Sequence, residues 1–373
     1  MAKRPSTKQG TPNDFSIVIP TYNRREILEQ CLRALAQQNF PSTQFEVIVV
    51  DDGSVDETRV YCEQVQTPYD LRYFREENAG AGAARRRGVS NATGKLLLLI
   101  NDDTIGFPDL LNRHLVAHQN HSHRDFCVLG TFEYPAAACQ KALDYFLATS
   151  PFLFPQPAMN PGFTAESYHF MTCNLSISRD AVLAAGSFDP TFRVGEDSDL
   201  GIRLILRGFK VLYDPAARAV HQHLNFTMEH LLQRAALYGP AHLKLFRKYP
   251  QLGDGKALFG RLDAATGPRI RAYLAERGHY IPGALASLRQ YDALDFAPFF
   301  HIDDGGRPLA LQVMDLFATA VPEVYQYHMY RSFLEAWEES PQGQNANVGQ
   351  AAREPSVGPA ASKRGEIRQV LEA

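Results

Sequence analysis

Residues 15–36 read FSIVIPTYNRREILEQCLRALA and contain two different patterns of hydrophobic residues. Phe15-Ser-Ile-Val-Ile19 is a short apolar run, which predicts a buried strand. The apolar residues that follow recur every three or four positions, which predicts a helix with one buried face. They are Ile27, Leu28, Cys31, Leu32 and Leu35. The polar segment 20–24 between the two patterns therefore lies where a strand ends and a helix begins.

The same alternation continues along the chain and predicts the fold. Further strands are expected at 45–50, 71–74, 95–100, 174–178, 209–213 and 219–221, and helices at about 56–66, 80–91 and 179–185. Strands that alternate with helices predict an α/β fold with a mostly parallel, Rossmann-like sheet covered on both faces. Ligands bind such sheets beyond the carboxyl ends of the strands. Four polar segments occupy that position, at residues 20–23, 51–54, 78–82 and 101–104.

Segments outside this pattern suggest how the chain is divided. Residues 1–13 are polar and are expected to be a disordered lead-in, and residues 14–225 form the α/β domain. A helical region is expected over 226–339, with breaks at the two X-Pro sites of 239–240 and 249–250, followed by a disordered tail over 340–373. Residues 126–170 are rich in proline and aromatic residues, and two interpretations stay open: a packed irregular loop, or a lid that binds an acceptor or touches a membrane.

Composition limits the class of protein. The 373 residues include 38 Lys and Arg and 41 Asp and Glu, a net charge of −3, which argues against a protein that binds nucleic acid by neutralising many phosphates. The five cysteines are an odd set without a CxxC pair, which fits a reducing compartment better than a zinc ribbon or disulfide scaffold. No apolar run reaches the ~20 residues that span a bilayer, and no signal peptide is visible. A cytoplasmic enzyme is expected.

Carboxylates follow two of the expected strands. Asp51-Asp52 follows Val-Ile-Val-Val, and Asn101-Asp102-Asp103 follows Leu-Leu-Leu-Leu-Ile. Carboxylates gathered at one sheet edge repel each other unless a cation or donor hydrogens compensate. A hard divalent cation such as Mg²⁺ or Mn²⁺, held together with substrate phosphates, is one solution. The alternative is that each Asp caps a turn or a helix.

Two further segments carry groups suited to anion binding or proton transfer. Asn78-Ala-Gly80-Ala-Gly-Ala-Ala-Arg85 offers a helix start that an anion can approach closely, but Arg85 stands where a dinucleotide fingerprint has Gly or Ala. Glu196 and Asp197 begin an apolar-faced helix. Two roles stay open for them: the helix dipole favours acidic residues in the first turn, and a carboxylate can also serve as a general base.

Two sets of histidines are candidate metal ligands or surface residues. His221 follows a strand and becomes a candidate metal ligand if the fold brings it to the carboxylates. The second group is expected on the surface and consists of His114, His118, His121 and His123.

These segments together resemble the family 2 glycosyltransferases, inverting enzymes with the A-type glycosyltransferase fold that use nucleotide sugars. The matching motifs occur in family order over about residues 15–225. They are Ile17-Val-Ile-Pro-Thr-Tyr-Asn-Arg24, Val49-Val-Asp-Asp-Gly-Ser54, Asn78-x-Gly80 with Ala84-Arg85, Asn101-Asp-Asp103, and Gly195-Glu-Asp-x-Asp-Leu200 with Arg203 and Gly208.

The resemblance implies that 14–225 is a catalytic domain that binds a nucleotide-diphosphate sugar, usually a UDP-sugar. Asp52 is implied to contact the base, and Asp51 to shape its loop. The full set of implied donor-binding residues is Pro20, Thr21, Asn23, Arg24, Asp51, Asp52, Asn78, Gly80, Arg85, Asn101 and Asp102.

The resemblance also implies a metal site and a catalytic base. The family's Asp-x-Asp motif maps to 101–103 with Asn101 at its first position, which leaves Asp103 as the main ligand of Mn²⁺ or Mg²⁺, with His221 as a further ligand. The family's Glu-Asp motif maps to Glu196 and Asp197, with Asp197 the expected base. Family members often have Asn after the Arg at 85, where this chain has another arginine.

The function implied is metal-dependent, inverting transfer of a sugar to an acceptor hydroxyl, in polysaccharide or glycoconjugate synthesis. The cation would stabilise the leaving diphosphate, and Asp197 would take the acceptor proton. Saccharide, lipid-linked and other hydroxyl acceptors stay open, as does peripheral contact with the cytoplasmic membrane face. A non-catalytic sugar-nucleotide-binding protein is the alternative, favoured by Asn101. A sugar nucleotidyltransferase would need a Gly-rich basic loop after the first strand, and residues 20–23 are not one.

Overall fold

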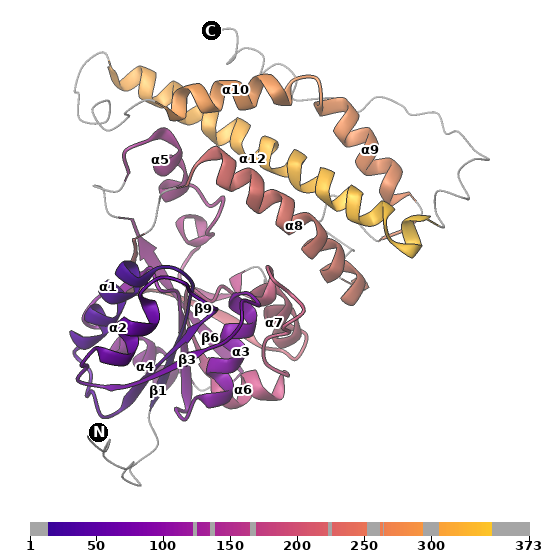
Figure 1. The fold of residues 1–373 in the computed structure, drawn as a ribbon. Helices are drawn as coiled ribbons and strands as arrows, with labels where there is room; N and C mark the ends of the chain where they lie inside the picture. The colour runs from indigo at the N-terminus through magenta and orange to yellow at the C-terminus, as the bar shows by residue number, and fades with distance from the viewer. Residues whose placement is uncertain are drawn as a thin grey trace. The chain divides into compact units, whose positions relative to one another are not determined.

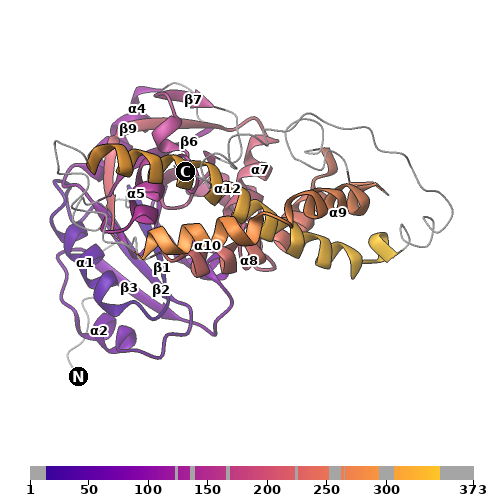
Figure 2. The same cartoon turned by 90° about the horizontal axis from the view of Figure 1, so that it is seen from above.

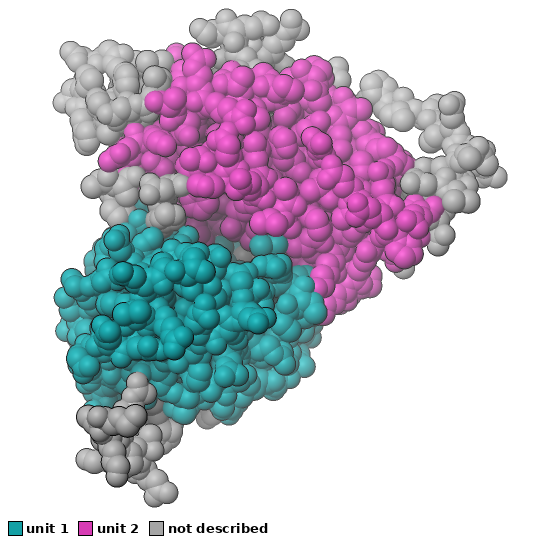
Figure 3. Space-filling model, viewed as in Figure 1, with its two compact units in different colours: residues 1–135, 159–223 teal, residues 136–158, 224–373 magenta. Residues whose placement is uncertain are grey.

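The computed structural model describes residues 14–121, 125–134, 139–164, 169–222, 226–251, 262–263, 265–293 and 306–344. The expected lead-in and most of the expected tail lie outside these residues, and the described part of the tail includes a helical turn at 341–344. The chain divides into two compact units, one of residues 1–135 with 159–223 and one of residues 136–158 with 224–373 (Figure 3). Segment 136–158 therefore belongs to the second unit, whereas the sequence analysis placed it inside a continuous domain.

The first unit contains a nine-stranded sheet whose N-terminal half is parallel. β1 (Phe15–Thr21) pairs in parallel with β2 (Phe45–Asp51) and with β4 (Leu96–Ile100), and β2 pairs with β3 (Asp70–Arg75). The strand order across this half is β3-β2-β1-β4. The expected α/β fold is confirmed, and the carboxyl ends of β1, β2 and β4 come to one edge.

The other half of the sheet is mixed. β8 (Asn174–Ser178) is antiparallel to β4 and to β6 (Phe126–Glu133), and β6 is parallel to β9 (Lys210–His221). The short strands β5 (Thr104–Gly106) and β7 (Gly162–Thr164) both pair with β9 in antiparallel fashion. The residues expected as two strands, 209–213 and 219–221, form the single strand β9.

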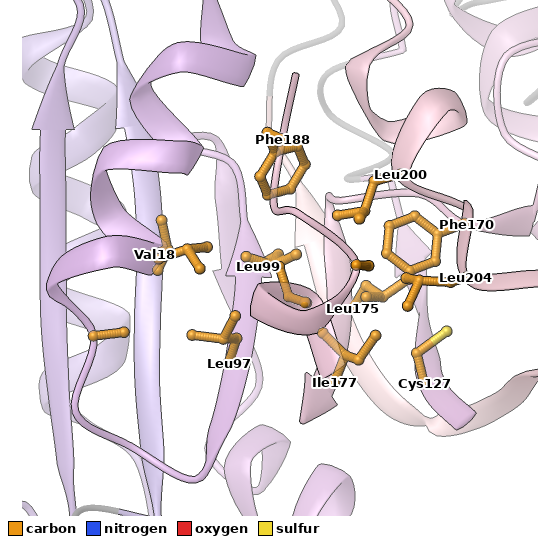
Figure 4. Close-up of a cluster of buried hydrophobic side chains, with 14 of the residues drawn as sticks. Val18, Leu97, Leu99, Cys127, Phe170, Leu175, Ile177, Phe188, Leu200 and Leu204 are labelled. Atoms are coloured by element: carbon orange, nitrogen blue, oxygen red, sulfur yellow. The ribbon is translucent and has the colours of Figure 1, made fainter. Parts of the chain in front are cut away.

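Alternation along the central strands builds a separate core on each face of the sheet. Val18, Leu97 and Leu99 point toward α3 (Ala81–Asn91), α6 (Arg179–Ala184) and α7 (Glu196–Ile205), where they meet Phe188, Leu200 and Leu204 (Figure 4). Their sequence neighbours face the opposite way, toward α1 (Arg25–Ala36), α2 (Thr58–Gln64) and α4 (Leu110–Asn120). Helices therefore cover both faces, as the sequence predicted.

The second unit is helical (Figures 1 and 2). It contains α5 (Ala142–Thr149), α8 (Met228–Lys248), α9 (Thr266–Arg277), α10 (Ile281–Asp292) and α12 (Gly306–Glu338). The long helix α12 packs against the other four, and α5 supplies buried apolar side chains to a core that it shares with α8, α10 and α12. None of the helices in the described part of the chain is long and apolar enough to span a membrane.

Two expectations about regular structure were wrong. The region 126–170 contains a buried strand, β6, and the helix α5, where the sequence analysis expected irregular structure. Helix α8 also continues through Gly239-Pro240, where a break was expected. The packing of α8 explains why no break occurs. Gly239 lies so close to α12 that a Cβ there would collide with Ser332 and Met329. This close contact between the two helices stabilises α8, although Pro240 cannot donate a helical hydrogen bond.

Two histidines of α4, expected on the surface, are instead buried or partly buried. His114 is fully buried, with Nδ1 2.8 Å from Ser176 Oγ and Nε2 2.9 Å from Asn174 Oδ1. His118 Nε2 lies 2.9 Å from the same Ser176 hydroxyl. Strand β8 thus supplies polar partners that no helix periodicity could reveal. The described residue His121 packs edge-on against Phe126, and His123 lies outside the described residues.

This buried pair predicts sensitivity to acid. Burial lowers the pKa of both His114 and His118 from 6.5 to about 4. The unfolded chain therefore binds protons that the folded chain excludes, so stability is full above pH 6.5 and falls as the pH drops toward 4. For His114 alone, we expect the free energy of unfolding to fall by about 2 kcal/mol between pH 7 and pH 4.5. Urea denaturation followed by circular dichroism at both pH values measures this loss.

The matched variants are His114→Gln, which removes the buried titrating group, and His279→Gln, which removes an exposed one. His114→Gln should lose part of the pH dependence, and His279→Gln should retain it. If His114→Gln kept the wild-type difference between the two pH values, His114 would not be the group responsible.

Candidate active site

The carboxyl ends of β1, β2 and β4 and the start of α3 surround a cavity of about 280 Å³. Seven of the eleven residues predicted to bind the donor line it, together with two that were not predicted to bind the donor, Tyr22 and Ala81. The seven are Pro20, Thr21, Arg24, Asp52, Arg85, Asn101 and Asp102. Parallel strands place their carboxyl ends together, which is why residues distant in sequence meet here.

The two aspartates after β2 differ in their surroundings. Asp51 is fully buried and accepts hydrogen bonds from Ser54 N, at 2.7 Å, and from the Tyr73 hydroxyl, at 2.6 Å. Asp52 lines the cavity and accepts hydrogen bonds from the backbone N–H groups of Ala79, at 2.8 Å, and Gly80, at 2.9 Å. Asp51 therefore fixes its own loop, and Asp52 ties that loop to the start of α3.

The remaining four predicted residues lie outside the cavity lining. Asn23, with φ of +53°, receives a hydrogen bond from Val55 N at 2.8 Å. Asn78 donates to the Asp52 carbonyl at 3.1 Å and accepts from Arg193 at 2.7 Å. Gly80 has φ of +98°, a conformation that strains other residues. Together with Asp51, these residues shape the loops around the cavity.

Asp102 and Asp103 form a buried acidic pair, each 4% exposed. Asp102 accepts hydrogen bonds from the Thr21 hydroxyl, at 2.8 Å, and from Arg24 Nη1, at 3.1 Å. The same Arg24 nitrogen lies 3.0 Å from Asp103 Oδ2. Burial raises the pKa of Asp102 to about 6, and Asp103 adds to the rise, whereas Arg24 opposes it.

The surroundings of the other oxygen of Asp103 show whether a metal ion could bind there. Asp103 Oδ1 is buried and has no hydrogen-bond partner among the described residues. His221, 5% exposed, places Nε2 3.6 Å from this oxygen. A carboxylate oxygen is a preferred ligand of Mn²⁺ and Mg²⁺, and an imidazole nitrogen adds a ligand that transition-metal cations accept more readily than Mg²⁺ does. Nowhere in the described residues, this site included, do three His, Cys, Asp or Glu side chains gather closely enough to hold a metal ion, so a cation here would need oxygens from a diphosphate or water.

Glu196 is held by a buried network that reaches Asn101. Arg85 Nη1 donates to Glu196 Oε1 at 2.6 Å, and Arg85 Nη2 donates to Asn101 Oδ1 at 2.7 Å. Arg85 is 5% exposed and Glu196 7%. A Cβ at Gly82 would lie 2.8 Å from Glu196 Cβ, so only glycine allows α3 to approach α7 this closely. The network connects the strand-end loop after β4 with the first turn of α7.

Asp197 lies in the first turn of α7 and is half-buried. Its Oδ1 accepts a hydrogen bond from Ser198 N at 2.7 Å. Burial raises the pKa of the Cys173 thiol, and the negative charges of Asp197 and Asp103 raise it further. The charges of the expected base and of the expected metal ligand therefore both reach the same buried thiol. Asp197 does not line the 280 Å³ cavity.

Several contacts that organise the site were not predicted from sequence. Arg203 bonds to Asp199 at 2.7 Å and to the Ser187 carbonyl at 2.7 Å, which anchors α7, and their i,i+4 spacing could have indicated the pair. Arg86, at the position where family members often have Asn, donates to the Phe188 carbonyl at 3.0 Å. No sequence signal indicated the contact of Tyr73 with Asp51, because it depends on strand register.

Comparison with known proteins identifies the family. The model of the family "Glycosyl transferase family 2" matches residues 16–173, a range that carries β1, β2, β4 and the acidic pair. Residues 16–173 are a family 2 glycosyltransferase domain. The resemblance drawn from the motifs is thus confirmed.

The alignments with relatives of this glycosyltransferase domain cover only part of each relative's length. The uncharacterized glycosyltransferase YfnE of Bacillus subtilis is 30% identical over 252 residues, 56% of this chain and 64% of that protein. Validoxylamine A glucosyltransferase of Streptomyces hygroscopicus subsp. jinggangensis is 28% identical over 221 residues, 52% of each chain. The chain therefore spans less than two thirds of the length of these relatives.

A solved structure supports the fold. Mannosyltransferase PcManGT from Pyrobaculum calidifontis, in complex with GDP-Man and Mn²⁺, aligns over 91% of this chain and 92% of its own with a TM-score of 0.50. The two sequences are 17% identical, so this likeness bears on the A-type glycosyltransferase fold alone.

Proposed function

We propose that the protein transfers a sugar from a nucleotide-diphosphate sugar, a UDP-sugar in the first instance, to an acceptor hydroxyl with inversion at the anomeric carbon. The observation that carries this proposal is the meeting of Asp52, Asp102, Arg24 and Arg85 at one cavity inside the family 2 domain, beside the Asp103 and His221 pair. The solved structure of the mannosyltransferase with GDP-Man and Mn²⁺ supports a nucleotide-sugar donor of this kind.

The cavity residues would bind the donor as follows. Asp52 would accept a hydrogen bond from the base, and Tyr22, 46% exposed, offers an aromatic surface next to it. Arg24 reaches the acidic pair and would face the diphosphate. Asp103 and His221 would hold Mn²⁺ or Mg²⁺, which supplies Lewis-acid stabilisation of charge on the leaving diphosphate.

Asp197 would act as the base. A carboxylate within hydrogen-bond reach of the acceptor hydroxyl takes its proton as that oxygen attacks the anomeric carbon from the face opposite the nucleotide. Asp197 Oδ1 is already held by Ser198 N, which orients the carboxylate. Arg85 would hold the neighbouring Glu196 in place through their 2.6 Å hydrogen bond. One carboxylate suffices, because the leaving diphosphate needs no proton donor.

The acceptor and the location remain proposals of the same kind. We propose a saccharide, lipid-linked or other hydroxyl acceptor in polysaccharide or glycoconjugate synthesis. The relative TarS of Staphylococcus aureus, a poly(ribitol-phosphate) β-N-acetylglucosaminyltransferase, supports such a role. The five described cysteines are all free and buried, which fits a reducing cytoplasm. Peripheral contact with the cytoplasmic membrane face belongs to the same proposal.

A thermal-shift panel tests the donor class. UDP, GDP, dTDP and CDP are each added with and without Mn²⁺. A nucleotide that binds the folded state at about 100 times its Kd stabilises it by ~2.7 kcal/mol, which for a domain of this size raises Tm by roughly 5 °C or more. Mn²⁺ should increase the shift for the preferred nucleotide. Asp103→Asn should lose this extra increase and keep the shift caused by nucleotide alone. No shift with any of the four nucleotides would contradict the proposed donor.

A further inference from the structure

One guanidinium nitrogen is shared between the two buried carboxylates that follow β4. Arg24 Nη1 lies 3.1 Å from Asp102 Oδ1 and 3.0 Å from Asp103 Oδ2. The side chain of Arg24 is 37% exposed, whereas those of Asp102 and Asp103 are 6% and 5% exposed. The guanidinium therefore reaches inward from the protein surface and supplies positive charge where the acidic pair would otherwise lie unbalanced.

The backbone of Arg24 is fixed, so its side chain is the part free to move. Arg24 is the residue before α1, and its carbonyl accepts the first helical hydrogen bond, from Leu28 N at 2.9 Å. The preceding Asn23 is bound through both its N–H and its side chain to the loop after β2. The Arg24 side chain makes no capping hydrogen bond to α1.

The charges at this position depend on what is bound. Arg24 contacts one oxygen of Asp103, and the other oxygen faces His221 at 3.6 Å, where the proposed cation would bind. A divalent cation there would lie close to the Arg24 guanidinium, and like charges at short range inside a protein repel strongly. Together the cation and Arg24 carry three positive charges against two carboxylates. A diphosphate adds the negative charge that removes this excess.

We propose that Arg24 acts as a built-in competing cation, which weakens divalent metal binding to the free protein and so makes metal binding depend on the nucleotide diphosphate. This inference rests on the proposed function. When the nucleotide binds, Arg24 turns from the carboxylates toward the diphosphate. Because coupling between two ligands is reciprocal, the metal then strengthens nucleotide binding by the same factor.

The test measures Mn²⁺ binding directly. Free Mn²⁺ is quantified by its electron paramagnetic resonance signal, with and without saturating UDP or GDP, for the wild-type chain and three variants. Arg24→Gln removes the charge, and Arg24→Lys keeps it. Arg25→Gln is the matched control, because Arg25 is the next residue, is 35% exposed and pairs with Glu29 at 3.0 Å.

We expect Arg24→Gln to bind Mn²⁺ without nucleotide about tenfold or more tightly than the wild-type chain does, because the repulsion is removed. The nucleotide should then strengthen its Mn²⁺ binding much less. Arg25→Gln should behave like the wild-type chain, and Arg24→Lys, which keeps the positive charge, should bind Mn²⁺ without nucleotide no more tightly than the wild-type chain does. Melting curves of each variant in Mn²⁺ report whether it is folded. Mn²⁺ alone should raise the Tm of Arg24→Gln more than it raises the Tm of the wild-type chain.

Two outcomes would overturn the inference, and they separate it from the proposed function. If the wild-type chain binds Mn²⁺ with UDP or GDP but Arg24→Gln shows the same affinities and the same dependence on nucleotide, Arg24 has no such role and the proposed function stands. If neither the wild-type chain nor Arg24→Gln binds Mn²⁺ with any nucleotide, both the inference and the metal-dependent part of the proposed function are wrong.

Discussion

Replacing Asp197 with Asn is expected to lower the turnover of sugar transfer by about 10²–10⁴-fold. The amide has nearly the shape of the carboxylate but cannot accept the acceptor's proton as the hydroxyl attacks. Binding of nucleotide and Mn²⁺ should be retained, because Asp197 lies outside the cavity lined by Asp52 and Asp102. Turnover measured with excess donor, together with nucleotide affinity by calorimetry, separates the two effects.

The control for this variant is Asp180→Asn. Asp180 also lies in the first turn of a helix, α6, and its side chain is 93% exposed, so the same chemical change occurs without a role in the site. Its turnover should equal that of the wild-type chain. Near-full turnover of Asp197→Asn would show that the base is another group.

Replacing Arg85 with Met should destabilise the first unit by about 3–5 kcal/mol, because it removes the buried positive charge that lies 2.6 Å from the Glu196 carboxylate. The double variant Arg85→Met/Glu196→Gln should recover part of this loss, since the negative charge that Arg85 balanced is then gone as well. Urea denaturation at neutral pH measures both.

Arg87→Met is the matched control, because Arg87 lies two residues away on α3, is exposed, and packs over the Phe74 ring. It should change stability by less than about 1 kcal/mol. If Arg85→Met were as stable as Arg87→Met, the Arg85 and Glu196 contact would contribute little to the folded state.

Much of the fold follows from local patterns in the sequence. The strands β1, β2, β3, β4 and β8 and the helices α1, α3 and α6 lie within a few residues of their expected positions, because each has a short apolar run or a helical period of its own. The pattern failed over 126–170. β6 lies between β8 and β9 in the sheet, and α5 packs against helices far along the chain. Because these partners are distant in sequence, the local pattern of residues did not predict either element.

The candidate site could be predicted as a set of residues but not as a set of contacts. The strand-end rule brought Thr21, Asp52 and Asp102 to one edge, where the cavity lies. It could not show that Asp102 takes both Thr21 and Arg24 as partners, or that Arg85 joins Asn101 to Glu196. These contacts depend on side-chain reach across three loops. The burial of His114 was not predicted for the same reason: its partners Ser176 and Asn174 belong to a strand distant in sequence.

The position of α5 in the second unit also affects how the chain is made. Leu143, Phe146 and Leu147 leave the ribosome early, but the helices that cover them, among them α8 and α12, are translated much later. At about 5–20 residues per second, this apolar face stays without its partners for on the order of ten seconds or more. A truncation after residue 223 would leave it without them permanently, so a fragment that carries the sheet alone would also need 136–158 replaced by a polar linker.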